Sequence, residues 1–267
     1  MKYKMVVLDL DDTLLNKNLE ISEETVKTLT RLKEMGVEIV IATGRMFSSA
    51  LPYINQLGIE GPVINYNGAY IKEVGKDRLI YHKPIPLDIA KKIIKEAEEA
   101  DLYINIYIDD LLYVAERNEK SDLYYKTTGA QSEPVGKLSE FIYKDPTKML
   151  IIEGNREKMQ EYLSYFKDKY RGIVAVTQSK DYFIEFMASG VSKGTAVEFL
   201  AEKLNIPLEE VIAIGDNWND LEMIQTAGLG IAMGNAPAGV REAADLVAGN
   251  HDEEGVSEIL KEIFSLK

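Results

Sequence analysis

Acidic side chains follow the first apolar run of the chain at a spacing that suits a cation. The run 5–10 predicts a buried strand, because it is short and rich in valine and leucine. A dry interior disfavours unpaired carboxylates, so we expect Asp9 and Asp11 at the carboxyl end of this strand, where parallel sheets bind ligands. Two close carboxylates repel each other unless a cation lies between them. Oxygen ligands suit Mg²⁺, and Mg²⁺ suits phosphate, so these residues alone predict magnesium-dependent phosphoryl chemistry.

Three further polar clusters stand at the ends of predicted strands or at the start of a predicted helix. Taken singly, such clusters are usually turns, helix caps or solvated lysines. Taken together, in this order and at these element ends, the ordinary explanations would require several coincidences. The residues are Thr43 and Gly44 after the predicted strand 37–42, Lys193 at the start of the predicted helix 193–204, and Asp216, Asn219 and Asp220 after the predicted strand 211–215.

Composition excludes several classes of function. The formal net charge of −13 disfavours nucleic acid and anionic membranes as partners. The sequence has no cysteine and two histidines, which argues against disulfides, thiolate chemistry, a histidine-rich metal site and a serine–histidine–acid triad. No apolar run approaches the roughly 20 residues that span a bilayer. We therefore expect a soluble, cytoplasmic protein.

The order of predicted strands and helices indicates two domains in the 267 residues. In 1–83 and 188–267, strands and helices alternate, which predicts an α/β core with a doubly wound, Rossmann-like parallel sheet. The regular alternation of strands and helices stops near the prolines at 84 and 86. The pattern in 84–187 predicts an inserted α+β domain. The core strands are expected at 5–10, 37–42, 62–65, 211–215 and 229–233, and those of the insert at 102–108, 111–115, 148–153, 173–177 and 182–187, with insert helices at 86–100 and 155–169.

The set of motifs resembles the haloacid dehalogenase (HAD) superfamily, and in particular the Cof-type phosphatases with a class IIB cap. The resemblance rests on Asp9-Leu10-Asp11-Asp12-Thr13, Thr43-Gly44-Arg45, Lys193 and Gly215-Asp216-Asn217-Trp218-Asn219-Asp220. It covers essentially the whole chain. Asp12 stands where the superfamily often has glycine, but aspartate tolerates unusual turn backbones better than most residues.

The resemblance implies a role for each motif. Asp9 would be the nucleophile that forms an aspartyl-phosphate, Asp11 the general acid and base, and Lys193 the cation that neutralises charge on the nucleophile and phosphoryl group. Mg²⁺ would be held by Asp9, Asp216 and the main-chain carbonyl of Asp11. The substrate-binding positions would be Leu10, Thr43, Gly44, Arg45 and Asn219, with Asn219 orienting either Lys193 or the phosphate.

Four other residues are open to two interpretations. Arg45 either binds the non-reacting part of the substrate or faces water at a helix start. Asp220 is expected to support the site or cap a helix rather than bind the metal. Trp218 is expected to pack rather than to line the pocket, and Asn67 to form a turn with the glycine that follows it.

These assignments predict an enzyme that hydrolyses a small phosphomonoester, such as a sugar phosphate or a similar metabolite, with the insert as a lid. A phosphomutase would share the active site almost entirely. A signalling receiver module also combines acidic residues, Mg²⁺, threonine and lysine, but it is about half as long and lacks an insert. The expected partner is a small phosphorylated metabolite, and the expected assembly is a monomer or a small homo-oligomer.

Overall fold

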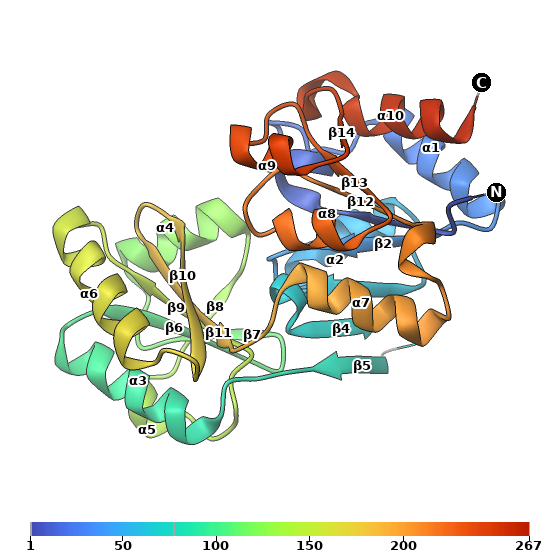
Figure 1. Cartoon of the computed structure of the whole chain (residues 1–267). Coiled ribbons are helices and arrows are strands. Elements are labelled where there is room, and N and C mark those ends of the chain that lie inside the picture. Colours follow the sequence, from blue (N-terminus) through green and yellow to red (C-terminus); the bar gives the residue numbers. More distant parts are fainter. Residues whose placement is uncertain (1, 77, 267) are drawn as a thin grey trace. The chain divides into compact units, whose positions relative to one another are not determined.

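The computed structural model describes residues 2–76 and 78–266. The chain forms two compact units, the first from residues 1–81 and 192–267 and the second from residues 82–191 (Figure 1). The predicted insert 84–187 falls within the second unit. Whether that unit acts as a lid stays a prediction.

An eight-stranded sheet forms the centre of the first unit, in the order β14-β13-β12-β1-β2-β3-β4-β5. The strands from β14 to β3 pair in parallel, and β4 pairs antiparallel with β3. This confirms the predicted α/β fold, and it adds β4, β5 and β14, which the sequence patterns did not predict. The strands are β1 (Met5–Leu8), β2 (Glu38–Ala42), β3 (Pro62–Asn65), β4 (Tyr70–Glu73), β5 (Arg78–His82), β12 (Val211–Gly215), β13 (Leu229–Ala232) and β14 (Leu246–Val247).

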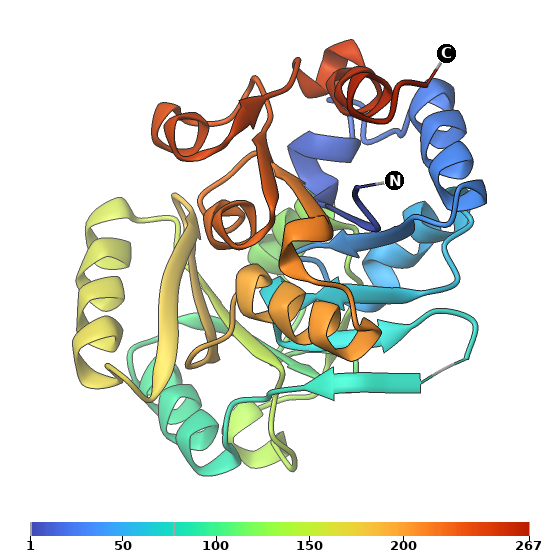
Figure 2. The same cartoon turned by 45° about the vertical axis from the view of Figure 1, so that its right-hand side comes forward.

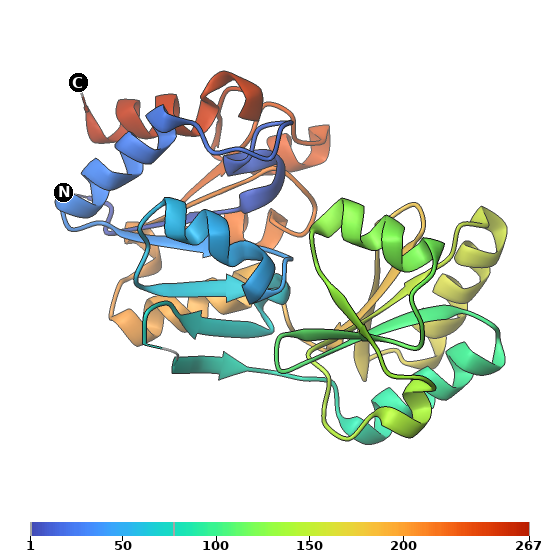
Figure 3. The same ribbon diagram turned by 180° about the vertical axis from the view of Figure 1, so that it is seen from behind.

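Helices cover both faces of this sheet, which makes it doubly wound. Val6 and Leu8 of β1 belong to the apolar cluster shared with α1, α2 and α10, whereas Met5 and Val7 belong to the cluster shared with α7 and α8. Figure 2 shows α7 in orange, and Figure 3 shows α1 and α2 in blue. The helices are α1 (Glu23–Glu34), α2 (Phe47–Gln56), α7 (Lys193–Leu204), α8 (Leu221–Thr226), α9 (Ala238–Ala243) and α10 (Gly255–Phe264), with short turns η1 (Leu10–Leu14), η2 (Tyr66–Gly68), η3 (Leu208–Glu210) and η4 (His251–Glu253).

The second unit has a six-stranded sheet in the order β10-β11-β9-β6-β7-β8. Apolar side chains of α3 and α6 pack on one of its faces. The elements α4, α5 and β8 were not predicted from the sequence. In α4 only Ser121 and Tyr124 are buried, too few for a helical apolar pattern. The elements are α3 (Leu87–Glu99), β6 (Tyr103–Ile108), β7 (Leu111–Val114), α4 (Glu119–Thr128), β8 (Ser132–Pro134), α5 (Leu138–Phe141), β9 (Lys148–Ile152), α6 (Arg156–Lys169), β10 (Val174–Lys180) and β11 (Phe183–Ala188).

A buried ion pair lies in the second unit, on strands β9 and β11. Lys148 Nζ lies 2.9 Å from Glu185 Oε1, and both side chains are less than a tenth exposed. Ser179 donates a second hydrogen bond to Glu185 Oε1 at 2.7 Å. A buried pair of this kind is costly to break, because removal of one partner leaves the other charge uncompensated.

We therefore expect Lys148→Met to destabilise the protein by about 3–5 kcal/mol, whereas Lys148→Met with Glu185→Leu restores most of the loss. Urea unfolding followed by circular dichroism measures both. The control is Lys144→Met, which removes an exposed pair with Asp109 and should leave the unfolding midpoint almost unchanged. A Lys148 single variant as stable as the wild type would contradict the prediction.

Candidate active site

Two distant segments converge at the carboxyl ends of neighbouring strands. β1 and β12 pair in parallel, with Leu8 opposite Ile214, so the residues that follow them emerge at the same edge of the sheet. Carboxylate oxygens of Asp9, Asp216 and Asp220 lie within 4.8 Å of one another, and all three residues are buried. Parallel pairing therefore accounts for the acidic cluster.

The buried ammonium of Lys193 lies between two of these carboxylates. Its side chain is fully buried, and its Nζ donates to Asp9 Oδ1 and, at 2.5 Å, to Asp220 Oδ1. Burial alone would lower the pKa of Lys193, but the charges of Asp220 and Asp9 outweigh that effect and raise it. Lys193 is therefore charged, and it neutralises part of the acidic cluster.

Asp220 holds the loop that follows β12. Its Oδ2 accepts hydrogen bonds from the main-chain N–H groups of Asp216 and Asn217, both at 3.0 Å. A side chain at Gly215 would lie about 2.5 Å from Asp220, so glycine is required at that position. Asp220 stands at the N-cap position of α8, which agrees with the alternative of a helix cap, but its side chain accepts no hydrogen bond from that helix.

The electrostatics of the cluster suit a hard cation. Burial raises the pKa of Asp9 well above its ordinary value, although the positive charge of Lys193 opposes this effect. The negative charges of Asp220 and Asp216 raise the pKa further. Burial and the negative charge of Asp220 raise the pKa of Asp216 to about 7. Thr13 donates to Asp216 Oδ1 at 3.2 Å. Among the described residues, Oδ2 of Asp9 and of Asp216 has no hydrogen-bond donor, so both atoms fit a divalent cation.

The turn η1 carries the rest of the first motif. Asp12 has a φ of 56°, a left-handed conformation that aspartate tolerates, and Asn235 donates to its carbonyl oxygen at 2.8 Å. The side chain of Leu10 belongs to the apolar core, so only its main chain is available to a ligand. β1 ends at Leu8 rather than at the predicted residue 10, because the chain turns into η1 there.

The second motif forms a tight turn after β2. The main-chain N–H of Arg45 donates to Thr43 Oγ1 at 3.1 Å, which leaves the hydroxyl proton of Thr43 free to donate elsewhere. Asn67, in a left-handed conformation, donates its N–H to the carbonyl oxygen of Thr43 at 3.0 Å. A side chain at Gly44 would lie 3.0 Å from Asn67 Oδ1, so glycine allows the two turns to pack closely.

Three polar or aromatic side chains differ from what the sequence suggested. Arg45 is 11% exposed and forms an ion pair with Asp11, so the water-facing alternative is wrong. Asn219 donates to Asn67 Oδ1 at 3.1 Å; the residues that hold Lys193 are Asp9 and Asp220 instead. Trp218 was expected to pack, but it is 59% exposed. Two further residues contact the site without a role predicted from the sequence: Thr13, which belongs to the first motif, and Asn67, which was predicted only as a turn residue.

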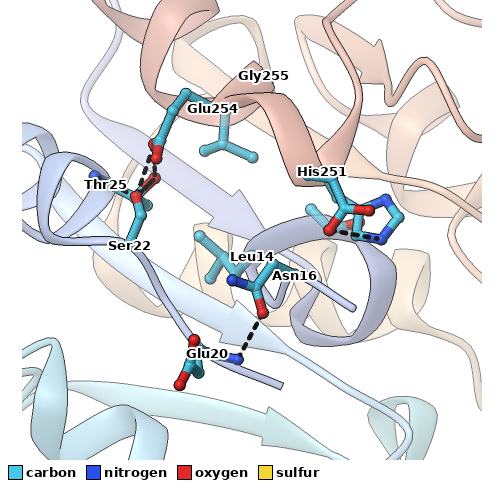
Figure 4. A pocket seen from close by; sticks show the side chains of 11 residues that line it. Leu14, Asn16, Glu20, Ser22, Thr25, His251, Glu254 and Gly255 are labelled. Atoms are coloured by element: carbon cyan, nitrogen blue, oxygen red, sulfur yellow. Dashed lines mark hydrogen bonds and ion pairs between the residues drawn. The ribbon is translucent and has the colours of Figure 1, made fainter. Parts of the chain in front are cut away.

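A small cavity of about 40 Å³ adjoins the first motif but is not the acidic cluster (Figure 4). None of Asp9, Asp216 and Asp220 lines it. Its lining carboxylate Glu254 accepts hydrogen bonds from Ser22 at 2.6 Å and from Thr25 at 3.2 Å. The volume suits one or two water molecules, so we interpret it as a structural cavity.

The family of the chain is shown by a match to the haloacid dehalogenase-like hydrolases that covers residues 6–260. The chain belongs to this family, which confirms the resemblance drawn from the four motifs. It is an enzyme, a hydrolase that acts on phosphoric monoesters, and the alternative of a signalling receiver module is wrong.

Individual relatives span the whole chain. A 5-amino-6-(5-phospho-D-ribitylamino)uracil phosphatase of Bacillus subtilis is 33% identical over 98% of each chain. A solved structure from Thermotoga maritima is 35% identical, with a TM-score of 0.91 over 97% of each chain. A haloacid dehalogenase-like hydrolase from Bacteroides thetaiotaomicron is 32% identical, with a TM-score of 0.92 over 98% of this chain and 100% of that one. Within the described residues, no helix is both long and apolar enough to cross a bilayer.

Asp220 offers a test of how the cluster is held. We expect Asp220→Asn to lower kcat/KM by about 10- to 100-fold, because an amide loses the charge that Lys193 faces and part of the capacity to accept the two N–H groups. Phosphate release measures the effect, and thermal unfolding shows whether the fold persists. Full activity in a folded variant would show that catalysis does not need the contacts of the Asp220 carboxylate with Lys193 and the two N–H groups.

Proposed function

We propose that the protein is a Mg²⁺-dependent phosphatase that hydrolyses a small phosphomonoester through an aspartyl-phosphate. The observation that carries the proposal is the placement of Lys193 between Asp9 and Asp220, with Asp216 in the same cluster. Asp9, Asp216 and the main-chain carbonyl of Asp11 would hold the cation, which when bound neutralises charge on the phosphoryl group.

Asp9 attacks phosphorus, and Asp11 moves the proton. As the ester P–O bond breaks, its electron pair passes to the leaving oxygen, which takes a proton from Asp11. Water then attacks the aspartyl-phosphate and gives a proton to Asp11, while the electron pair of the Asp9–phosphorus linkage returns to Asp9. Lys193 offsets the charge of Asp9 and of the phosphoryl group throughout.

The turn after β2 suits the phosphoryl oxygens. The hydroxyl of Thr43 keeps its proton for donation, and the main-chain N–H of Gly44 belongs to the same turn. We propose that these two groups, with the main chain of Leu10 and the side chain of Asn219, bind the oxygens that carry charge in the transition state.

The substrate class is proposed as a small phosphorylated metabolite. Support comes from the names of relatives, which include the uracil-derivative phosphatase above and a pyridoxal phosphate phosphatase of Escherichia coli that is 24% identical. The net charge of −13 disfavours polyanionic partners such as nucleic acid. We propose residues 82–191 as the lid that selects the leaving group, and the cytoplasm as the location.

Replacement of the nucleophile tests the proposal most directly. We expect Asp9→Asn to lower the turnover of p-nitrophenyl phosphate by at least about 10³-fold with the fold intact, because the amide cannot form the covalent intermediate. Release of free phosphate measures the turnover, and circular dichroism shows whether the fold is intact. Near-wild-type turnover by Asp9→Asn would refute the mechanism. An isomerised sugar phosphate without free phosphate would indicate a phosphomutase.

Metal dependence provides a separate test. We expect EDTA to abolish turnover and Mg²⁺ to restore it. We also expect Mg²⁺ to raise the melting temperature of the wild type, because a cation relieves the repulsion between Asp9 and Asp216 and binds only the folded state. Asp216→Asn should lose most of that thermal shift. Full activity after removal of divalent ions would contradict the proposed cofactor.

A further inference from the structure

Arg45 and Asp11 form a two-pronged ion pair outside the cluster around Lys193. Arg45 Nη2 donates to Asp11 Oδ1 at 2.5 Å, and Nε donates to Oδ2 at 2.9 Å and to Oδ1 at 3.1 Å. Such a fork fixes the plane of a carboxylate as well as its position. The side chain of Asp11 is 44% exposed, so it would be free to rotate without this partner.

Arg45 is held in place by contacts that do not involve Asp11. Its carbonyl oxygen accepts from the N–H of Tyr66 at 3.1 Å and from Asn65 Nδ2 at 3.4 Å. Its guanidinium lies 5.2 Å from the centre of the Tyr53 ring, and its N–H is bound by Thr43. The arginine is therefore an anchored group, because the ends of β2 and β3 and helix α2 all contact it.

Asp11 has no comparable anchor. It has extended backbone angles, with a φ of −77° and a ψ of 131°, within the turn η1. Among the described residues, Arg45 is the only side chain that hydrogen-bonds to its carboxylate. The orientation of the Asp11 carboxylate is thus set by Arg45, which lies in the turn after β2, whereas Asp11 follows β1.

We propose that Arg45 is a positioning residue that orients the Asp11 carboxyl group for proton transfer at the leaving oxygen, an inference that rests on the proposed function. The proton passes from Asp11 to the leaving oxygen as the ester bond breaks, and the attacking water later returns one. Each carboxylate oxygen has two lone pairs, and Oδ2 of Asp11 accepts only one hydrogen bond from the fork. The second lone pair is available to the transferred proton.

The test compares two substrates of similar shape that differ in how much the leaving group needs a proton. p-Nitrophenolate leaves without protonation, whereas the phenolate of phenyl phosphate is far more basic. We expect Arg45→Met to lower kcat/KM for phenyl phosphate by about 10- to 100-fold and for p-nitrophenyl phosphate by no more than about threefold. Arg45→Lys should give the same split, because lysine keeps the charge but not the fork.

Asp11→Asn is the matched comparison, because it removes the proton carrier and keeps the main-chain carbonyl. It should show the same preference for the better leaving group. Adding Arg45→Met to Asp11→Asn should then change kcat/KM by less than about twofold for either substrate, since a residue that acts through another has no effect once that other is gone. Melting temperatures confirm that each variant is folded, and Arg45→Lys carries the test if Arg45→Met unfolds.

Two results would overturn the role of Arg45. One is an equal loss on both substrates through KM, which indicates that Arg45 binds the substrate directly. The other is that Arg45→Met lowers kcat/KM as strongly in the Asp11→Asn variant as in the wild type. Failure of the wild-type enzyme to turn over either ester with Mg²⁺ would instead contradict the proposed function itself.

Discussion

The buried contact of Lys193 with Asp9 and Asp220 is the interaction on which the site depends. Three carboxylates this close, and this far from water, repel one another strongly. The ammonium offsets part of that repulsion from within the fold, and Asp220 uses its other oxygen to hold the loop that carries Asp216. One lysine at the start of α7 therefore joins the ends of β1 and β12 both electrostatically and mechanically.

The arrangement divides the charged residues into two groups with different tasks. Asp9, Asp216, Asp220 and Lys193 form the buried group, in which a cation is favoured. Arg45 and Asp11 form a second, partly exposed pair. This separation keeps the carboxyl group of Asp11, which we propose for proton transfer, apart from the carboxylates that we propose for the metal. In the proposed mechanism, neutralisation of the phosphoryl charge and protonation of the leaving oxygen would thus depend on different side chains.

The sequence predicted β1, β2, β3, β12 and β13, together with the polar residues that follow three of them, because both follow local patterns. Apolar runs that end in Asp9, Thr43 and Asp216 indicate strands and their carboxyl ends without knowledge of distant contacts. The missed elements lack such patterns: β14 has two residues, and α4 buries few of its side chains. The partners of Arg45 and Asn219 were also missed, because pairs such as Asp11 with Arg45 depend on which strand ends adjoin, and sequence spacing does not reveal this.

The long separation between paired strands has a consequence for how the chain is made. Asp9 and Lys193 are 184 positions apart, and β12, the neighbour of β1, follows Lys193 in the sequence. On the ribosome, β1 and β2 are therefore complete while one edge of β1 still has no strand to pair with. All of residues 82–191 emerge before that edge is covered, which favours slow folding and gives the nascent chain a period of exposure to aggregation.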